Sequence, residues 1–215
     1  RVPEQWYGDF LAAVGAARIG ERKLKEFVAQ YGRDTVARFI RQWFDYSERR
    51  MASALGAIPA GTVSDSTRHD PTPAVPEGIP VSVKITADPA NRWIEVDLRD
   101  NPDCLDCGLN LSEACSTSAV ITALFNCLEW DIPKNAGSFR RITVHLRENC
   151  CVGIPTFPHS CSMATTNLTD RVVNVTQSAF AKFGEGFGLA QGGNAMGAPM
   201  AVVSGNDHRH GGEPY

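Results

Sequence analysis

The chain has 215 residues, of which 43% are hydrophobic and 21% are charged, and it carries a net charge of −3 and seven cysteines. This balance predicts a packed core, and the scattered lysines and arginines argue against a nucleic-acid partner, whose phosphates require a concentrated basic surface. No apolar run approaches the ~20 residues that span a bilayer, and no secretory leader is present. We therefore expect no membrane partner, a cytoplasmic location and reduced thiols.

Two amphipathic helices are predicted at the start of the chain. Apolar residues recur at helical spacing from 3 to 31 and again from 35 to 57. Gly32 is expected to end the first helix and Asp34 to cap the second. A short turn between two such helices predicts an antiparallel hairpin, which we assign to residues 1–58.

Residues 59–80 break this periodicity and contain five prolines. We interpret them as a linker or crossing loop and as the boundary between two parts of the chain. Apolar and polar residues then alternate over 81–86 and 94–98, on either side of an Asp-Pro-Ala-Asn turn. This pattern predicts a hairpin of two half-buried antiparallel strands.

Further elements are expected downstream. Ser112 can cap a helix that runs to about Glu129, and the prediction continues with a turn at 135–137, a strand at 141–146, a helix from about Thr169 and a buried strand at 198–204. The fold class is therefore α+β: an N-terminal antiparallel helical hairpin, a Pro-rich linker, and a mixed α/β domain of residues 81–215 with short, largely antiparallel strands.

Cysteine and histidine spacing raises two metal hypotheses. Cys104 and Cys107 have the C-x-x-C spacing of a shared metal ion, but a zinc site needs about four ligands and the chain has no second such motif, so a reduced loop pair is the alternative. Residues 207–210 read Asp-His-Arg-His, and an extended tail would place both imidazoles on one side. An ordinary polar tail explains the same residues.

Two catalytic motifs are also considered. His159, Cys161 and Cys151 could supply a cysteine nucleophile with its base, which requires a hydrogen bond that a sequence cannot place. The glycine run of residues 184–197 lacks the Gly-Lys-Ser/Thr ending of a phosphate-binding loop. We interpret it as a loop whose backbone closely approaches another backbone or a ligand.

Five segments together resemble a known family. They read AARIGERKLKEFVAQYG, DYSERRM, IEVDL, DIPKNAG and TTNLTDRVVN followed by glycines. In this order and spacing they resemble the hydantoinase B family, which includes the B subunits of N-methylhydantoinases, the matching half of 5-oxoprolinase, and related subunits of acetone and acetophenone carboxylases.

Two departures from the family pattern are visible. The segment LRDNPDCLDCGLN stands where family members usually have a small-residue turn, and the family's N-terminal part, with an aspartate- and histidine-rich motif that looks like its metal site, is absent. The chain therefore resembles the middle of a B subunit. Because the sequence opens on Arg1, we interpret it as a piece of a longer subunit.

The resemblance implies ATP-dependent attack on an unreactive carbonyl. It implies a hetero-oligomer in which a hydantoinase A-type subunit binds most of the ATP, a small-molecule carbonyl substrate, and a possible divalent metal (Mg, Mn or Zn). An amidohydrolase that opens a cyclic amide is the first hypothesis. An ATP-dependent ketone carboxylase is the close alternative, and a non-catalytic structural subunit is the alternative of another class.

The resemblance also suggests site residues. We expect catalytic roles for Asp170, Arg171 and Asn167, and substrate-binding roles for Asn135, Asp97 and His159. Cys104 and Cys107 are the candidate metal ligands. For each polar residue in this set, a turn or helix-cap role is the competing interpretation.

Overall fold

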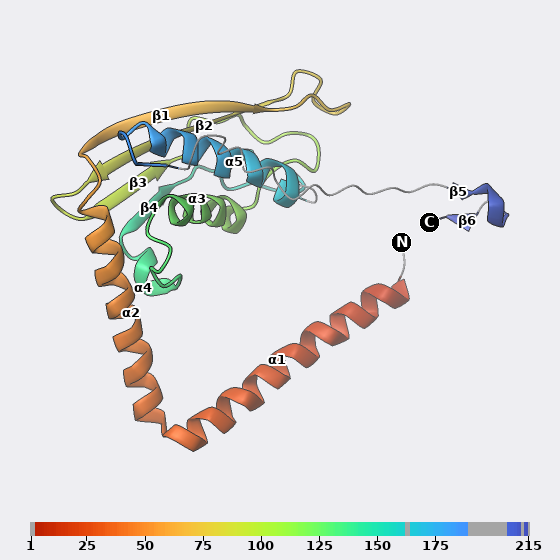
Figure 1. Ribbon diagram of the computed structural model, residues 1–215. Coiled ribbons are helices and arrows are strands. Elements are labelled where there is room, and N and C mark those ends of the chain that lie inside the picture. The colour runs from red at the N-terminus through yellow and green to blue at the C-terminus, as the bar shows by residue number, and fades with distance from the viewer. Residues whose placement is uncertain (1–2, 162–163, 189–205, 212, 215) are drawn as a thin grey trace.

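The computed structural model describes residues 3–161, 164–188, 206–211 and 213–214. The α+β class is confirmed, because two N-terminal helices precede a four-stranded, mostly antiparallel sheet with helices against one face (Figure 1). The elements are α1 (Pro3–Tyr31), α2 (Arg33–Leu55), β1 (Gly61–His69), β2 (Ile79–Asp88), β3 (Trp93–Asp97), α3 (Glu113–Cys127), α4 (Ala136–Phe139), β4 (Ile142–His145), α5 (Ala164–Ala181), β5 (Asn206–Asp207), the short 3₁₀ helix η1 (His208–His210) and β6 (Glu213–Pro214).

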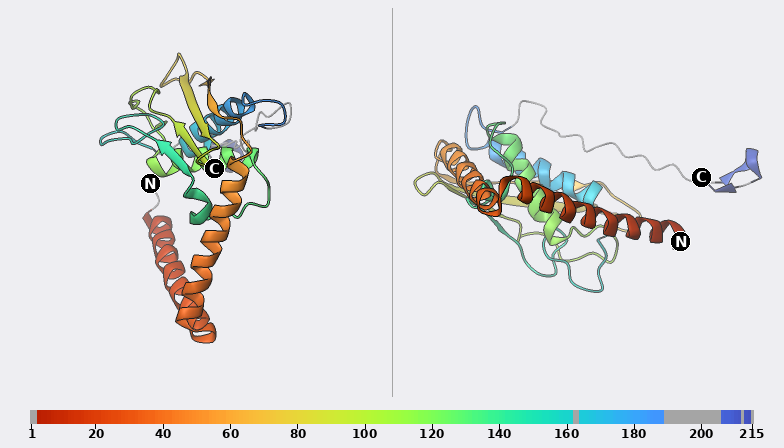
Figure 2. Two further views of the ribbon diagram at one scale, coloured as in Figure 1. Left: turned by 90° about the vertical axis from the view of Figure 1, so that its left-hand side faces the viewer. Right: turned by 90° about the horizontal axis from the view of Figure 1, so that it is seen from below.

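The two N-terminal helices form a V instead of a packed antiparallel pair. They meet at Gly32 and diverge, so that α1 lies away from the sheet (Figures 1 and 2). The expectation of an antiparallel pair is corrected for a simple reason: one residue connects the helices, whereas a helical hairpin needs about 2–5 loop residues to reverse the chain. Gly32, at φ 81°, serves as the N-cap of α2, and Asp34 lies in the first turn. No residue of α1 is buried, and no described helix is long and apolar enough to cross a membrane.

The sheet has the strand order β1-β2-β3-β4. β3 pairs antiparallel with β2, as the predicted 81–98 hairpin requires. β1 also pairs antiparallel with β2, and β4 pairs parallel with β3. The inward side chains of β2 and β3 are at most 5% exposed. Helices α3 and α5 lie side by side against this face and complete the core.

Strand β1 occupies part of the segment that we expected to be an irregular linker. Its residues Gly61–His69 pair with β2 along their whole length. The polar run Thr-Val-Ser-Asp-Ser-Thr lacks the hydrophobic alternation by which strands are usually recognised, although threonine and valine favour extended backbone. The assigned boundaries of residues 1–58, 59–80 and 81–215 as separate units remain a prediction.

The outer edge of β1 is protected by its own chain. Lys182 Nζ donates to the Ser64 carbonyl at 2.7 Å, and Asp65 Oδ1 accepts from the Ser66 N–H at 2.9 Å. Groups that would otherwise be free to bind another strand are thus satisfied, which is how natural proteins keep sheet edges from pairing with other chains.

The downstream helices α3 and α5 form where helices were predicted, but the start of α5 differs from the prediction. Ser112 caps α3 as predicted, accepting from the Cys115 N–H at 3.3 Å. Helix α5 starts at Ala164, five residues before the expected Thr169. The Thr-Thr-Asn sequence at its start has low helix propensity, which explains the late prediction. The strand expected at 198–204 lies outside the described residues.

Candidate functional site

One face of α5 carries a row of polar side chains. Asp170, Arg171, Asn174 and Gln177 follow at helical spacing, on the side away from the buried Val172 and its apolar neighbours. We call these four residues the polar face of α5. Asn167 is one turn earlier on the same helix, and its side chain lies outside the described residues.

Buried polar atoms without partners concentrate on this face. Among the described residues, five buried side-chain nitrogen or oxygen atoms lack a hydrogen-bond partner, and four belong here: Arg171 Nε, Asn174 Oδ1, and Gln177 Oε1 and Nε2. Gln177 is only 2% exposed. Buried polar groups in folded proteins are nearly always hydrogen-bonded, so four orphaned atoms on two turns of one helix call for a partner.

The glycine run turns back onto the same helix. Gly188 has a φ of 82°, and a Cβ there would lie 2.6 Å from the Cβ of Ala181 and 2.7 Å from its Cα. Only glycine fits so close an approach, which confirms the expected close backbone contact in this run at Gly188. Ala181 is one helical turn beyond Gln177, so the chain returns over the C-terminal end of the polar face.

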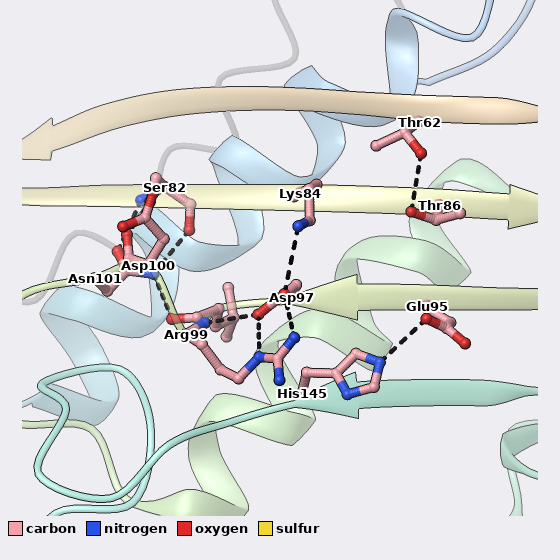
Figure 3. A network of polar contacts seen from close by, with 11 residues as sticks. Thr62, Ser82, Lys84, Thr86, Glu95, Asp97, Arg99, Asp100, Asn101 and His145 are labelled. Atoms are coloured by element: carbon pink, nitrogen blue, oxygen red, sulfur yellow. Dashed lines mark hydrogen bonds and ion pairs between the residues drawn. The ribbon is translucent and has the colours of Figure 1, made fainter.

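Asp97 lies elsewhere, on the open face of the sheet. β3 alternates, with Ile94 and Val96 buried toward the helices, so that Glu95 and Asp97 point to the opposite side (Figure 3). Arg99 donates to both carboxylate oxygens of Asp97, from Nε at 3.0 Å and from Nη2 at 2.8 Å, and Lys84 Nζ is 3.6 Å away. The sheet therefore separates Asp97 from the polar face of α5.

The open sheet face forms a shallow polar cleft of about 510 Å³ around Asp97. Its lining includes Ser64, Ser82, Lys84, Asp97 and Asp100. These groups largely bond to one another, as when the Ser82 hydroxyl donates to the Asp100 carbonyl at 2.5 Å. Both carboxylate oxygens of Asp97 thus accept hydrogen bonds from Arg99 just beyond the end of β3, and substrate binding by Asp97 stays a prediction.

The pairing of Asp97 predicts an acid-sensitive contribution to stability. Arg99 lowers the pKa of Asp97 from 3.8 to about 2, against the opposing effect of burial. A carboxylate whose pKa is lowered on folding stabilises the native state above its unfolded pKa. This stabilisation is lost as the pH falls, here between about pH 4 and pH 2. We expect the loss of stability on acidification to be smaller by roughly 1 kcal/mol in Asp97→Asn than in the unaltered chain. This value allows for solvent screening of the ion pair, because the Arg99 side chain is 54% exposed. Urea unfolding at about pH 5 and pH 2.5 measures it.

The matched control is Asp100→Asn, a neighbouring exposed carboxylate on the same cleft. The control should keep the acid-dependent loss seen in the unaltered chain. If Asp97→Asn loses stability on acidification as steeply as this control does, the ion pair has no such role.

Asn135 lies at a junction between α2 and α4. Its Oδ1 accepts from the Gly137 N–H at 2.8 Å, which caps α4, and its Nδ2 donates to the Ser47 hydroxyl at 2.8 Å. Ser47 is fully buried on α2. We call the contact of Phe44 and Ser47 on α2 with Asn135 and Gly137 the α2–α4 junction. Here the helix-cap interpretation of Asn135 is the one with observed hydrogen bonds.

Ion pairs surround this junction. Arg50 contacts Glu129 at 3.0 Å and Asp131 at 2.8 Å, while Glu48 contacts Arg140 at 3.0 Å and Arg141 at 2.7 Å. Arg140 and Arg141 lower the pKa of Glu48, chiefly through the hydrogen bond from Arg140. The DYSERRM and DIPKNAG motifs are therefore two halves of one structural contact.

His159 lies on a third site, in the loop that follows β4. Its Nδ1 is 2.9 Å from the Thr156 carbonyl oxygen, and its Nε2 is 3.8 Å from the fully exposed carboxylate of Asp106. Asn110 bonds this loop to the cysteine-containing one by donating to the Leu105 and Ser160 carbonyls at 2.9 and 3.0 Å. The structure thus places His159 beside the Cys104–Cys107 loop, in the segment that leads into α5.

The cysteines of these two loops are free thiols. Burial raises the pKa of Cys104. A hydrogen bond with Cys150, together with burial, raises the pKa of Cys151, which disfavours the thiolate that a nucleophile needs. Over the described ranges, no three His, Cys, Asp or Glu side chains are arranged to hold a metal ion. The metal role of Cys104 and Cys107 remains a prediction.

The C-terminal histidines lie in η1 and not in an extended segment. The backbone of His208–His210 is therefore not the extended segment on which the two-imidazole hypothesis depends. The side chains of Asp207 and His210 are outside the described residues.

The sequence did not single out Asn174 and Gln177. Each continues the spacing of Asp170 and Arg171 along α5, and this periodicity is the signal that could have found them. Nothing in the sequence marks their oxygen and nitrogen atoms as unpaired, because pairing depends on what the fold brings next to them.

The fold and its sites define an α+β domain with a projecting helical arm, formed by α1 and α2, and a polar face on α5. The chain belongs to the hydantoinase B/oxoprolinase family, whose model matches residues 1–215. It is 28% identical over 213 residues to the caprolactamase subunit beta of Pseudomonas jessenii, covering 97% of this chain and 35% of that protein. It is 25% identical over 175 residues to an uncharacterized protein of Methanocaldococcus jannaschii, covering 81% and 30%.

Two solved structures share the fold. The ATP-dependent caprolactamase from Pseudomonas jessenii superposes with a TM-score of 0.68 at 22% identity, over 83% of this chain and 30% of that one. Nucleotide-free acetone carboxylase superposes with a TM-score of 0.64 at 12% identity, over 74% and 22%. The chain spans about a third of the length of the curated relatives with which it aligns over most of its own length.

Proposed function

We propose that the chain is part of the B-type subunit of an ATP-dependent amidohydrolase of the hydantoinase/oxoprolinase type, which opens a cyclic amide. Membership of the family and the likeness to a caprolactamase subunit over 97% of the chain support this proposal. An A-type partner subunit binds most of the ATP, and the assembly is a cytoplasmic hetero-oligomer.

The observation that carries the proposal is the set of orphaned polar atoms on α5. Together they offer N–H donors from Arg171 and Gln177 and carbonyl acceptors from Asn174 and Gln177. A cyclic amide presents one carbonyl acceptor and one N–H donor on the same side. Such a substrate supplies the partners that these groups lack, and its own polar atoms are then paired in a site shielded from water.

The residues of the polar face have distinct roles in this proposal. The Arg171 guanidinium stabilises negative charge that develops on the carbonyl oxygen. Asp170, next to it on α5, accepts hydrogen bonds from the substrate or from the attacking water. Asn174 and Gln177 orient the amide group. ATP, when bound by the partner, supplies the phosphoryl group that activates the carbonyl oxygen, and burial of the site excludes water until that activation.

A divalent metal (Mg, Mn or Zn) enters none of these roles. The described residues provide no grouped metal ligands, so no step is assigned to a metal here. Asn135, Asp97 and His159 are each engaged in the separate contacts given above. Substrate binding by these three residues stays a prediction outside the present proposal, while Asn167 remains in it as a neighbour on α5.

The test uses the full-length subunit assembled with its partner. With ATP, we expect hydrolysis of a hydantoin or lactam, and we expect Asp170→Asn and Arg171→Gln each to reduce kcat/KM by about 100-fold or more. Lys182→Gln is the matched control, because Lys182 directly follows α5 but reaches β1, and it should keep full activity.

The outcomes separate the alternatives. Incorporation of labelled bicarbonate into a ketone, with no amide hydrolysis, would assign the complex to the ketone carboxylases. Full activity in both Asp170→Asn and Arg171→Gln would contradict a site on α5 and favour a non-catalytic structural subunit.

A further inference from the structure

Helix α1 carries an uninterrupted apolar seam. From Trp6 to Tyr31 one row of apolar and small residues is spaced alternately four and three residues apart, which is the a/d pattern of a coiled coil sustained over almost four heptads. Tyr7, Leu11 and Ile19 are further exposed apolar residues of α1 outside this row. The eight seam positions are Trp6, Phe10, Ala13, Ala17, Gly20, Leu24, Phe27 and Tyr31.

This seam has no partner among the described residues. All eight positions are exposed, and the aromatic side chains at the two ends of α1 are between 47% and 66% exposed. Because α2 diverges from α1 beyond Gly32, it does not cover the seam (Figures 1 and 2). An amphipathic helix of this kind is stabilised mainly by packing of its apolar face, so the seam requires an occupant.

The charges of α1 are complementary to those of a second, antiparallel copy of the same helix. Its first half carries Glu4 and Asp9 and no basic residue, whereas its second half carries four basic and two acidic residues. Antiparallel pairing therefore places the acidic half of one copy against the basic half of another.

Side-chain sizes along the seam are matched in the same register. With the two-fold axis at Gly15, Phe10 of one copy faces Gly20 of the other, Ala13 faces Ala17 and Trp6 faces Leu24, whereas Phe27 and Tyr31 lie beyond the paired segment. A bulky ring thus meets a position without a side chain, and two small residues allow close approach at the centre. Gly20 has open space around it, since a Cβ at this position would meet no atom within 4 Å, so the ring of a second copy can enter.

Flanking charges agree with this register. Asp9 and Lys23 each directly precede a seam residue, Phe10 and Leu24, so they occupy the same flanking heptad position, seven residues on either side of Ala16. The antiparallel register brings Asp9 of each copy beside Lys23 of the other. In the single chain Lys23 pairs with Glu26 at 2.9 Å, but both side chains are more than half exposed, so this pair can be exchanged at little cost.

We propose that α1 is a homodimerisation element that forms an antiparallel coiled coil with α1 of a second copy of the chain. This interface is separate from the polar face of α5 and does not depend on the proposed function. It joins two B-type subunits through their projecting arms.

Charge exchange tests the proposed partner. Sedimentation equilibrium of the full chain should show a dimer, and Asp9→Lys or Lys23→Asp alone should raise its Kd by about tenfold or more, because each places like charges together twice across the two-fold axis. The double variant Asp9→Lys/Lys23→Asp should restore the Kd to within about threefold. Only pairing of α1 with another copy of itself predicts this restoration.

Cross-linking tests the register in the assembled complex. Ala16→Cys places a thiol opposite its own counterpart and should give a disulfide-linked dimer under mild oxidant, whereas Arg22→Cys, on the far side of α1, should not. A monomeric chain, a double variant that stays as weak as the single ones, or equal cross-linking at both positions would overturn the proposal. Absence of the Ala16→Cys dimer in the complex would also overturn it and assign the seam to another part of the subunit or to its partner.

Discussion

Gly137→Ala should lower the free energy of unfolding by about 3 kcal/mol or more, one of the two largest effects that we expect from a single substitution in this chain. A Cβ at position 137 would lie 2.1 Å from the Phe44 carbonyl oxygen and 2.6 Å from its Cα. Both contacts are with backbone, so no side-chain rotation can relieve them, and α4 would have to move off α2. Chemical denaturation measures the loss directly.

The consequence of this movement extends along the junction. Displacement of α4 would break the hydrogen bond from Asn135 to Ser47 and leave the buried Ser47 hydroxyl with the Trp43 carbonyl alone. It would also separate Arg140 from Glu48. We therefore expect the arm to become more sensitive to proteolysis in Gly137→Ala, since α4 is the element with which α2 has its most extensive contact.

Gly56→Ala provides a matched control at the C-terminal end of α2, the helix against which Gly137 packs. A Cβ there meets carbonyl oxygens at 3.4 Å, an ordinary contact, and the residue has the helical φ of −67°. We expect a change of less than about 1 kcal/mol, because alanine also restricts the unfolded chain. Similar losses in the two variants would show that the close approach of Gly137 to Phe44 is not a determinant of stability.

Much of the fold could be predicted because it depends on local periodicity. The alternation of Val81, Val83 and Ile85 and the cap at Ser112 are signals contained in a few neighbouring residues, and the structure follows them. The course of β1 could not be predicted in this way. Val63 is the only apolar residue of this strand, and the inward-facing Asp65 pairs with Ser178 and Lys182, which lie more than 100 residues later in the chain.

The candidate site shows the same limit. Asp170 and Arg171 could be proposed from a motif, but the proposal also joined Asn135 and Asp97 to them, and the structure places these residues on different faces. Asn135 belongs to the α2–α4 junction and Asp97 to the open face of the sheet. A motif reports that a residue type is required at a position, and both a catalytic role and a helix cap produce that requirement.

The unpaired state of Gln177 could not be predicted at all, and it leads to the second large effect. Gln177→Leu should raise the free energy of unfolding by about 1–2 kcal/mol, because a buried amide with no partner costs stability that an apolar side chain of similar size does not. The same variant should reduce kcat/KM of the assembled enzyme by about 100-fold, because the amide group that orients the substrate is gone. Urea denaturation of the chain and ATP-dependent hydrolysis by the complex measure the two effects.

Thr176→Val separates these effects from a general disturbance of α5. Thr176 is as buried as Gln177, but its hydroxyl donates to the Val172 carbonyl at 2.7 Å and points away from the polar face. Because its bond is satisfied within the helix, we expect a stability change of at most about 1 kcal/mol and unchanged activity. Gln177→Leu and Thr176→Val each remove one buried polar group, and the two residues are adjacent. A difference in activity between these variants therefore depends on whether the removed group belongs to the polar face.

The opposite signs of the two effects make Gln177 a sharper test than loss of activity alone. A residue kept for packing loses stability when it is replaced, whereas a residue kept for binding can gain stability while activity falls. If Gln177→Leu destabilises the chain, its amide is paired in the folded protein and the orphaned atoms on α5 are not a binding site. If the variant is more stable and fully active, the carbonyl substrate binds elsewhere in the subunit. Only a gain in stability together with a loss of activity places the substrate against the polar face of α5.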